Sequence, residues 1–325
     1  MKYAWIEVQR DSYPVVMLCE LLGVSRSGWY AARRRQPSAR QVSNERLLRA
    51  IRQCQKRHRG RYGRRRAHQE LRAGAVEPIN EKRVGRLMRE AGLQCRKRRR
   101  YRPSIDAQYG SAVAPNVLRR DFSATAPNQK WLADMTQVAT AEGWLHVALV
   151  LDLFSRKLIG WAMSDSRTHQ VTLEALQMAL GWRDPPPGLI HHSDRGGQYA
   201  IYPYRKVLAA RGITMSMSRK GNCWDNAPME SVNGTIKVEC VRGARFKTRA
   251  EAARELMQYF GYYNTERLHS SLGYMTPSAF ELRWQSEATD DEAARVAHRR
   301  PASCSNDATR RPAVDNACAR GRGVH

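Results

Sequence analysis

Three acidic residues, Asp134, Asp194 and Glu230, occupy positions from which carboxylates could act together. Asp134 interrupts an apolar, β-prone run, where a lone acid is more often a structural group or an edge charge. Asp194 ends a short strand-like run and precedes two glycines, so a ligand could approach its carboxylate. Hard divalent cations prefer oxygen ligands, and two of them about 3.5–4 Å apart promote in-line displacement at a phosphodiester. The three acids therefore predict a metal site for displacement chemistry at a phosphodiester.

The segment around Glu230 predicts a helix that Asn226 could cap and Pro228 could start, which places Glu230 near a positive helix end. Lys237 follows two turns later and should share the face of Glu230. A separate apolar stripe would dock this helix on a core, and it consists of Met229, Val232, Ile236 and Cys240. Three carboxylates held close repel one another, so a metal-free site should be floppy or have raised pKa values.

The elements that must position these acids alternate in type. Strands are predicted around Asp134, over 144–153 and over 157–163, then a helix over 168–182. A short strand over 189–191, a helix over 199–210, a strand over 213–215 and the helix of Glu230 follow. The fold class predicted is α/β, a mixed five-stranded sheet with flanking helices, preceded by an all-α region.

The N-terminal third is helical in pattern. Residues 14–35 read as helix, turn, helix with Ser25 as a cap, although an ordinary helical hairpin fits these residues about as well. A clearer helix begins after Asn80 and ends at Gly92, with apolar residues on one face. We therefore expect a helix-turn-helix-like segment over 1–40 and a basic helical domain over 41–102.

The net charge of +26 lies mainly in this helical third. Residues 1–120 hold 30 basic against 9 acidic residues, whereas residues 121–285 hold 19 against 15. A basic module beside a nearly neutral one indicates a polyanionic partner. A solvated basic face is the plainer interpretation, but dense charge runs repel themselves without a partner. The residues predicted to contact DNA, besides Lys237, are Arg64, Arg65, Arg83, Arg86, Arg96, Lys97, Arg98, Arg99 and Arg100.

The remaining composition narrows the class of protein. A proline-containing stretch over 103–126 predicts a linker, and residues 285–325 predict a disordered tail. No membrane span or signal peptide is indicated, so a cytoplasmic location is expected. The seven cysteines form no Cys-x-x-Cys pair, which favours reduced thiols. A metal site formed by Cys54, His58 and His68 is disfavoured for the same reason.

Several motifs resemble one family. Thirty-five residues separate Asp194 from Glu230, as in the retroviral integrase superfamily, and the chain is more closely similar to the catalytic OrfB subunit of insertion sequence three family transposases. The resemblance covers about residues 1–284. The matching blocks lie at 127–136, 192–199, 225–231, 263–272 and 276–277, with upstream matches at 22–28, 60–65 and 80–89.

The resemblance implies an RNase H-like integrase core over 127–284, with Asp134, Asp194 and Glu230 as catalytic ligands of two Mg²⁺ or Mn²⁺ ions. It implies that Lys237 contacts DNA near them. The expected activity is that of a DDE-type polynucleotidyl transferase, which cleaves element ends and joins 3′-hydroxyls to DNA. Expected partners are double-stranded DNA, further copies of the chain and an upstream OrfA protein, separate or fused by frameshifting. An RNase H-like junction nuclease and a DNA-binding regulator with an inactive core are the alternatives.

Overall fold

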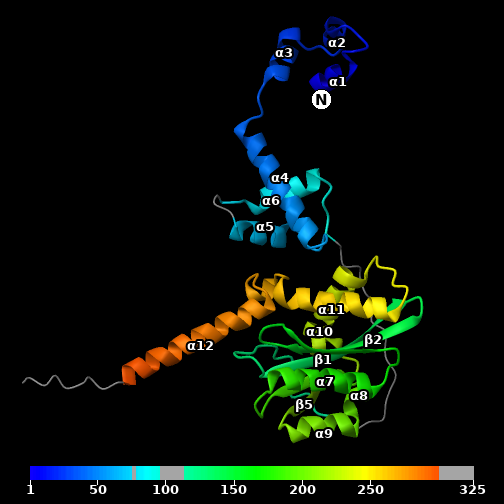
Figure 1. The fold of residues 1–325 in the computed structure, drawn as a ribbon, viewed down its shortest axis with the longest axis vertical. Helices are drawn as coiled ribbons and strands as arrows, with labels where there is room; N and C mark the ends of the chain where they lie inside the picture. The colour runs from blue at the N-terminus through cyan, green and yellow to red at the C-terminus, as the bar shows by residue number, and fades with distance from the viewer. Residues whose placement is uncertain (75–77, 96–112, 300–325) are drawn as a thin grey trace, which may run out of the picture. The chain divides into compact units, whose positions relative to one another are not determined.

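The computed structural model describes residues 1–74, 78–95 and 113–299. Its internal contacts divide the chain into two units, Met1–Ala279 and Phe280–His325. The first unit holds two groups of helices followed by a sheet with helices on both faces (Figure 1). Each part is described by itself below.

Three short helices begin the chain: α1 (Lys2–Gln9), α2 (Val15–Leu21) and α3 (Arg26–Arg34). They share a small core that includes Ile6, Leu18 and Trp29. The hydroxyl of Ser25 caps α3 by accepting a hydrogen bond from the Gly28 N–H at 3.1 Å. The helix, turn and helix predicted over 14–35 are confirmed, whereas α1 was not predicted.

A second helical domain consists of α4 (Ala39–Arg57), α5 (Arg64–Ala73) and α6 (Glu81–Glu90). Its core contains Ile51, Tyr62 and Val84, all with no exposed surface. The side chain of Asn80 caps α6 by accepting the Lys82 N–H at 2.8 Å, as predicted. Gly92 ends this helix with φ +67°, a left-handed conformation that glycine adopts without strain.

The sheet has five strands: β1 (Lys130–Thr140), β2 (Gly143–Asp152), β3 (Leu158–Ser164), β4 (Ile190–Ser193) and β5 (Thr214–Met217). Their spatial order is β3-β2-β1-β4-β5. The first three strands form an antiparallel meander, and β4 and β5 run parallel to β1. The mixed five-stranded sheet is confirmed, and β1 lies at its centre.

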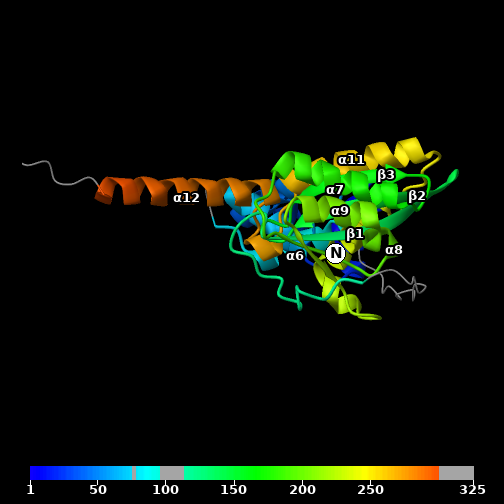
Figure 2. The ribbon, with the colours of Figure 1, turned by 90° about the horizontal axis from the view of Figure 1, so that it is seen from below.

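Helices cover both faces of the sheet. One face carries α7 (His169–Arg183), α8 (Gly197–Ala200) and α9 (Tyr202–Ala210), which Figure 2 shows from below; the other carries α10 (Ala227–Ile236) and α11 (Arg249–Thr265). Successive residues of β1 point to opposite faces, so Trp131 belongs to the core under α7 and Leu132 to the core under α11. Burial on both faces explains why β2 is apolar without alternation.

Three irregular turns complete this domain: η1 (Cys223–Asn226) and η3 (Ser270–Leu272) are 3₁₀ turns, and η2 (Lys237–Val241) is a π-helical turn that continues α10. A π turn holds more residues per turn than an α-helix. The face that a residue of η2 presents therefore cannot be extrapolated from the α-helical spacing of α10.

Two predicted boundaries differ from the structure. The predicted linker, 103–126, is described only from residue 113, and its described part packs on the sheet domain. Leu118 is buried there, and its N–H donates to the hydroxyl of Ser216 at 3.1 Å. Periodicity could not reveal this, because isolated anchors hold the segment.

The predicted disordered tail also begins too early at 285. The helix α12 (Pro277–Arg299) continues to residue 299, and Arg283 pairs with Glu287 one turn later at 2.7 Å. Alanine, glutamate and arginine have high helix propensity, which lack of an apolar pattern does not cancel. Residues 300–325 lie outside the described ranges.

Two further expectations concern absences. Within the described ranges, no helix is long and apolar enough to cross a membrane. Cys19, Cys54, Cys95 and Cys240 are free thiols, as expected for cysteines without a pairing pattern.

Gly160 tests the packing of α7 on the sheet. A Cβ at this position of β3 would overlap the carbonyl oxygen of Ala175 and lie 2.8 Å from the Cβ of Ala179. We expect Gly160→Ala to lower the free energy of unfolding by about 1–3 kcal/mol, as overpacked cores do. Gly181 lies in α7 and has open space around it, so Gly181→Ala should be neutral or stabilising by up to about 1 kcal/mol. Equal urea midpoints for the two variants would contradict the close packing.

Candidate active site

The parallel pairing of β1 with β4 brings two of the three acids together. Ala133 is the register partner of Ser193 in the last residue pair of this ladder. The residue that follows each of them is an acid, Asp134 in β1 and Asp194 just beyond β4. The two carboxylates are therefore neighbours because of strand register, although 60 positions separate them in the sequence.

Each of these two carboxylates has a fixed orientation. Oδ1 of Asp134 accepts the Met135 N–H at 2.8 Å, and its Oδ2 accepts the side-chain amide of Asn233 at 2.7 Å. Oδ1 of Asp194 accepts the N–H of Gly196 at 3.0 Å, within the turn after β4. These donors account for part of the hydrogen-bonding capacity of each carboxylate, since a carboxylate can accept about four hydrogen bonds.

Burial and neighbouring charge act on Asp134. Protein atoms surround its carboxylate, and this desolvation, with the negative charges of Asp194 and Glu230, raises its pKa to about 8. The hydrogen bonds from Met135 and Asn233 oppose the rise. A raised pKa in a metal-free cluster of acids is what the sequence predicted from charge repulsion.

The third acid, Glu230, is exposed in the first turn of α10. Pro228 starts this helix as predicted, but the predicted cap is wrong. The side chain of Asn226 donates to the main-chain carbonyl of Ala133 at 3.2 Å and makes no capping bond. This bond fastens the start of α10 beside Asp134, so it serves the site in another way.

Asn233 was missed by the sequence reasoning. It lies on α10 three residues after Glu230, and residues with this spacing share a helix face. Its amide contacts Asp134, so α10 reaches the central strand through the same face that presents Glu230. The helical spacing alone could have identified it.

Asp225 was also missed as a positioning residue. Its carboxylate has no exposed surface and accepts hydrogen bonds from Asn116, Arg120 and Arg219 at 2.7–2.9 Å. The bonds from Arg219 are the main cause of a pKa well below the ordinary range, so Asp225 stays charged. It joins the segment from residue 113 to the loop that leads into α10, and no local pattern signals such a distant clamp.

The three acids are close enough for their charges to interact, but their carboxylate oxygens do not form a tight cluster. Within the described ranges, the one group of three metal-ligand side chains whose ligand atoms all lie within 4.8 Å of one another is Cys54, His58 and Glu70. The Asp134, Asp194 and Glu230 oxygens are thus spread more widely, in a site made of oxygen donors alone. Such donors suit Mg²⁺ or Mn²⁺ and do not suit softer metals.

The polar side chains of the cluster around Glu70 contact the Glu70 carboxylate. The Cys54 thiol donates to Glu70 at 3.5 Å, the His58 ring lies 2.5 Å from the same carboxylate, and Arg57 pairs with it at 3.0 Å. Burial raises the pKa of Cys54 to about 12, which opposes the thiolate that a metal needs. His68 bonds the Ile79 carbonyl instead. A metal site remains disfavoured here.

The residues predicted to contact DNA fall into four groups. Arg64 and Arg65 are exposed, and Arg64 pairs with Glu81 at 3.0 Å. Arg83 is half-buried and donates to Asn44 and Ser43, while Arg86 pairs with Glu90. Lys237 begins η2. Arg96, Lys97, Arg98, Arg99 and Arg100 lie outside the described ranges.

Models of known protein families match the helical domain and the sheet domain. Residues 124–223 and 211–277 match two models described as an integrase core domain, and residues 43–101 match an HTH-like domain. The HTH-like match thus falls on the domain of α4–α6, whereas the sequence pattern suggested a helix-turn-helix over 14–35.

The chain matches two relatives over nearly the whole length of each relative. The chain is 43% identical over 272 residues to an insertion element IS600 uncharacterized 31 kDa protein of Shigella sonnei, covering 83% of this chain and 100% of that one. It is 40% identical over 284 residues to the transposase InsF for insertion sequence IS3A of Escherichia coli (strain K12), covering 86% and 98%.

Among solved structures, the HTLV-2 integrase catalytic core domain in complex with magnesium (trimeric form) matches with a TM-score of 0.38 at 14% identity. The match covers 49% of this chain and 99% of that chain. A likeness at this level carries no information about the site.

The raised pKa of Asp134 predicts how stability depends on pH. In the metal-free protein the folded state retains a proton that the unfolded state releases, so folding is penalised as pH rises from about 4 towards 8. The penalty is absent below the unfolded pKa and complete above the folded one. Asp134→Asn removes the titrating group. Its free energy of unfolding should therefore exceed that of the wild type by an amount that grows across this window.

Urea unfolding in EDTA at a series of pH values would measure this difference. Asp165→Asn removes an exposed acid and serves as the matched control, for which the wild-type pH profile is expected. Parallel profiles for wild type and Asp134→Asn would contradict the raised pKa.

Proposed function

The chain belongs to the IS3 family of insertion-sequence transposases, with an integrase core behind an HTH-like domain, and we propose that Asp134, Asp194 and Glu230 are its catalytic residues. The observation that carries the proposal is the convergence of three carboxylates from β1, the end of β4 and α10. The reaction proposed is cleavage at the element ends and joining of the freed 3′-hydroxyls to DNA by phosphodiester transesterification.

The proposed cofactor is a pair of Mg²⁺ or Mn²⁺ ions held by these three acids. The fit rests on the all-oxygen donor set and on the raised pKa of Asp134, since a cation would stabilise its charged form. When bound to these residues, the ions would supply activation of an attacking hydroxyl and stabilisation of the departing oxygen.

The chain's own residues hold the ligands in place. Asn233 and the Met135 N–H fix Asp134, and the Gly196 N–H fixes Asp194, so little reorientation is needed when the cations bind. Asp225 fixes the loop before α10 and, through it, the start of the helix that carries Glu230. Lys237, just after this helix, is proposed to contact a phosphate of the bound DNA.

The proposed partner is double-stranded DNA, at the element ends and at the target. The HTH-like match and the exposed Arg64 and Arg65 support this role for the domain of α4–α6. Assembly of several copies on DNA and action with an upstream OrfA protein follow from the family resemblance and are part of the proposal. The place of action would be the bacterial cytoplasm, where such DNA lies.

Asp194→Asn tests the chemistry. With Mn²⁺ and a duplex made from the DNA that flanks the gene, the wild type should give strand-transfer products, and the variant should give none because it lacks one metal ligand. Asp184→Asn, which removes an exposed acid after α7, should retain them. Gel analysis of labelled strands separates the possible outcomes.

Hydrolysis without joining would favour a junction nuclease. Duplex binding without cleavage under either metal would favour a DNA-binding regulator, and both results would overturn the proposed reaction. Products that persist in Asp194→Asn would remove this acid from the site.

Arg64→Ala/Arg65→Ala tests the DNA contact of the helical domain. Each lost phosphate contact should lower the slope of log affinity against log salt by about 0.9, so the double variant should lose up to about 1.8. Arg205→Ala/Lys206→Ala removes the same charge from the exposed surface of α9 and should leave the slope unchanged. Fluorescence anisotropy over a salt series gives both slopes, and equal slopes would exclude Arg64 and Arg65 from the interface.

A further inference from the structure

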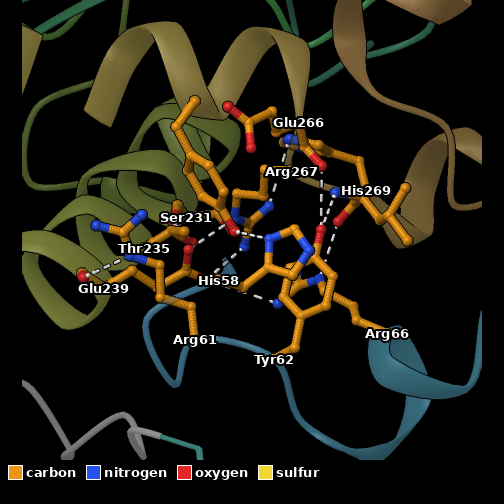
Figure 3. Close-up of polar contacts among 12 residues, drawn as sticks. His58, Arg61, Tyr62, Arg66, Ser231, Thr235, Glu239, Glu266, Arg267 and His269 are labelled. Atoms are coloured by element: carbon orange, nitrogen blue, oxygen red, sulfur yellow. Dashed lines mark hydrogen bonds and ion pairs between the residues drawn. The ribbon is translucent and has the colours of Figure 1, made fainter. Parts of the chain in front are cut away.

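The segment from 58 to 66 comprises the connection between α4 and α5 and the first residues of α5, and it contacts the sheet domain. We name it the docking loop. Tyr62 at its centre has no exposed surface and His58 is almost fully buried. The two rings stack with centroids 3.8 Å apart (Figure 3). Part of this basic, aromatic segment is therefore buried in a contact within the chain.

Two hydroxyl groups fasten the docking loop to the end of α11. The Tyr62 hydroxyl donates to the Glu266 carbonyl at 3.1 Å and accepts the Leu268 N–H at 2.9 Å. The Tyr262 hydroxyl lies 3.0 Å from Nδ1 of His58. The two Tyr62 bonds satisfy main-chain groups just beyond the end of α11, and the Tyr262 bond joins two side chains.

Two arginines of the docking loop extend further, to the π-helical turn η2. Nε of Arg61 donates to the main-chain carbonyl of Glu239 at 3.1 Å, and its guanidinium lies over the rings of Tyr259 and Tyr262 at 4.9 and 4.6 Å. Arg66 donates to the Leu268 carbonyl at 2.9 Å and lies 3.6 Å from the Glu239 carboxylate. Both arginines thus meet at one residue (Figure 3).

Glu239 is a buried anion with several partners. Arg267 binds its two oxygens at 2.8 and 2.9 Å, and the Tyr259 hydroxyl donates at 2.9 Å. Burial is the largest single influence and would raise its pKa, but the hydrogen bonds and charge of Arg267, together with the charge of Arg66 and the bond from Tyr259, lower it. Arg267 and His269 are both buried. They pack here.

The position of Glu239 gives this network its consequence. It lies in η2, the direct continuation of the helix that carries Glu230 and Asn233. A π turn is a costly irregularity and is often found near functional sites, so something must hold it. Here one holder is the sheet domain's own Arg267, and the other is the docking loop.

We propose that Arg61 and Arg66 are positioning residues for the active site: by binding η2 they hold α10, and so Glu230, in register with Asp134. The inference rests on the proposed function for its catalytic consequence, but not for its structural claim. It assigns the HTH-like domain a second task besides DNA binding. A misplacement of about 1 Å at a catalytic group can cost about 100-fold in rate.

The test uses the full chain with Arg61→Met/Arg66→Met, and Arg64→Met/Arg65→Met as the control. The control removes the same charge from the same segment but from exposed side chains. Amide hydrogen exchange over residues 227–241 should become at least about ten-fold faster in the first variant and remain unchanged in the control. Exchange in β2 should be unchanged in both.

Catalysis provides the second readout. On the duplex made from the DNA that flanks the gene, cleavage at saturating DNA should fall about 10- to 100-fold in Arg61→Met/Arg66→Met. Its DNA affinity should be no weaker than that of the control. Arg66→Lys, which keeps the charge with a single donor group, should lie between the wild type and Arg66→Met in both exchange and rate.

The outcomes are distinct. Wild-type exchange over 227–241 in the double variant, with weakened DNA binding, would place both arginines on DNA and overturn the inference. Faster exchange everywhere, β2 included, would indicate that the double variant is destabilised as a whole. In that case Arg66→Lys decides: wild-type exchange with reduced cleavage in this variant would overturn the inference. A wild type that cleaves no DNA refutes the proposed function, while the exchange data still decide the inference.

Discussion

The parallel ladder between β1 and β4 is the constraint on which the site depends. Only four residue pairs form it, yet its register decides that Asp134 and Asp194 are neighbours. A shift of one residue would turn one of the two acids to the opposite face of the sheet. The meander β1-β2-β3 supports the ladder from one side, and helices on both faces cover the sheet. The helices supply the third acid and the polar groups that hold the first two.

Much of this arrangement could be predicted, because it follows from local patterns. Apolar runs predicted the five strands, and spacing predicted α6 and its Asn80 cap. Asp134 stood out as an acid within an apolar run, Asp194 as an acid at a strand end and Glu230 as an acid near a helix start. Resemblance to a family gave them a shared role. Their assignment as metal ligands remains a prediction. The structure adds that they come from adjacent elements and that their charges interact.

What could not be predicted depends on contacts between distant positions. Asp225 looks like an ordinary acid before a helix, and only the folded chain brings Asn116 and Arg120 to its carboxylate. Arg61 and Arg66 belong to a basic run in which every arginine looks alike. Whether an arginine faces solvent or a neighbouring domain depends on tertiary packing, which sequence periodicity does not encode for a loop. The same limit misplaced the cap at Asn226.

The order of the strands also bears on how the protein is made. The ladder that joins Asp134 to Asp194 cannot form until β2, β3 and α7 have been synthesised, since β4 follows them in the chain. Glu230 comes later still, and η2, which continues its helix, is held by Arg267, which is synthesised after both. Contacts between such distant residues form slowly. A nascent chain therefore exposes its basic N-terminal helices well before it can assemble the three acids, so the helical domain can fold before the carboxylate cluster is complete.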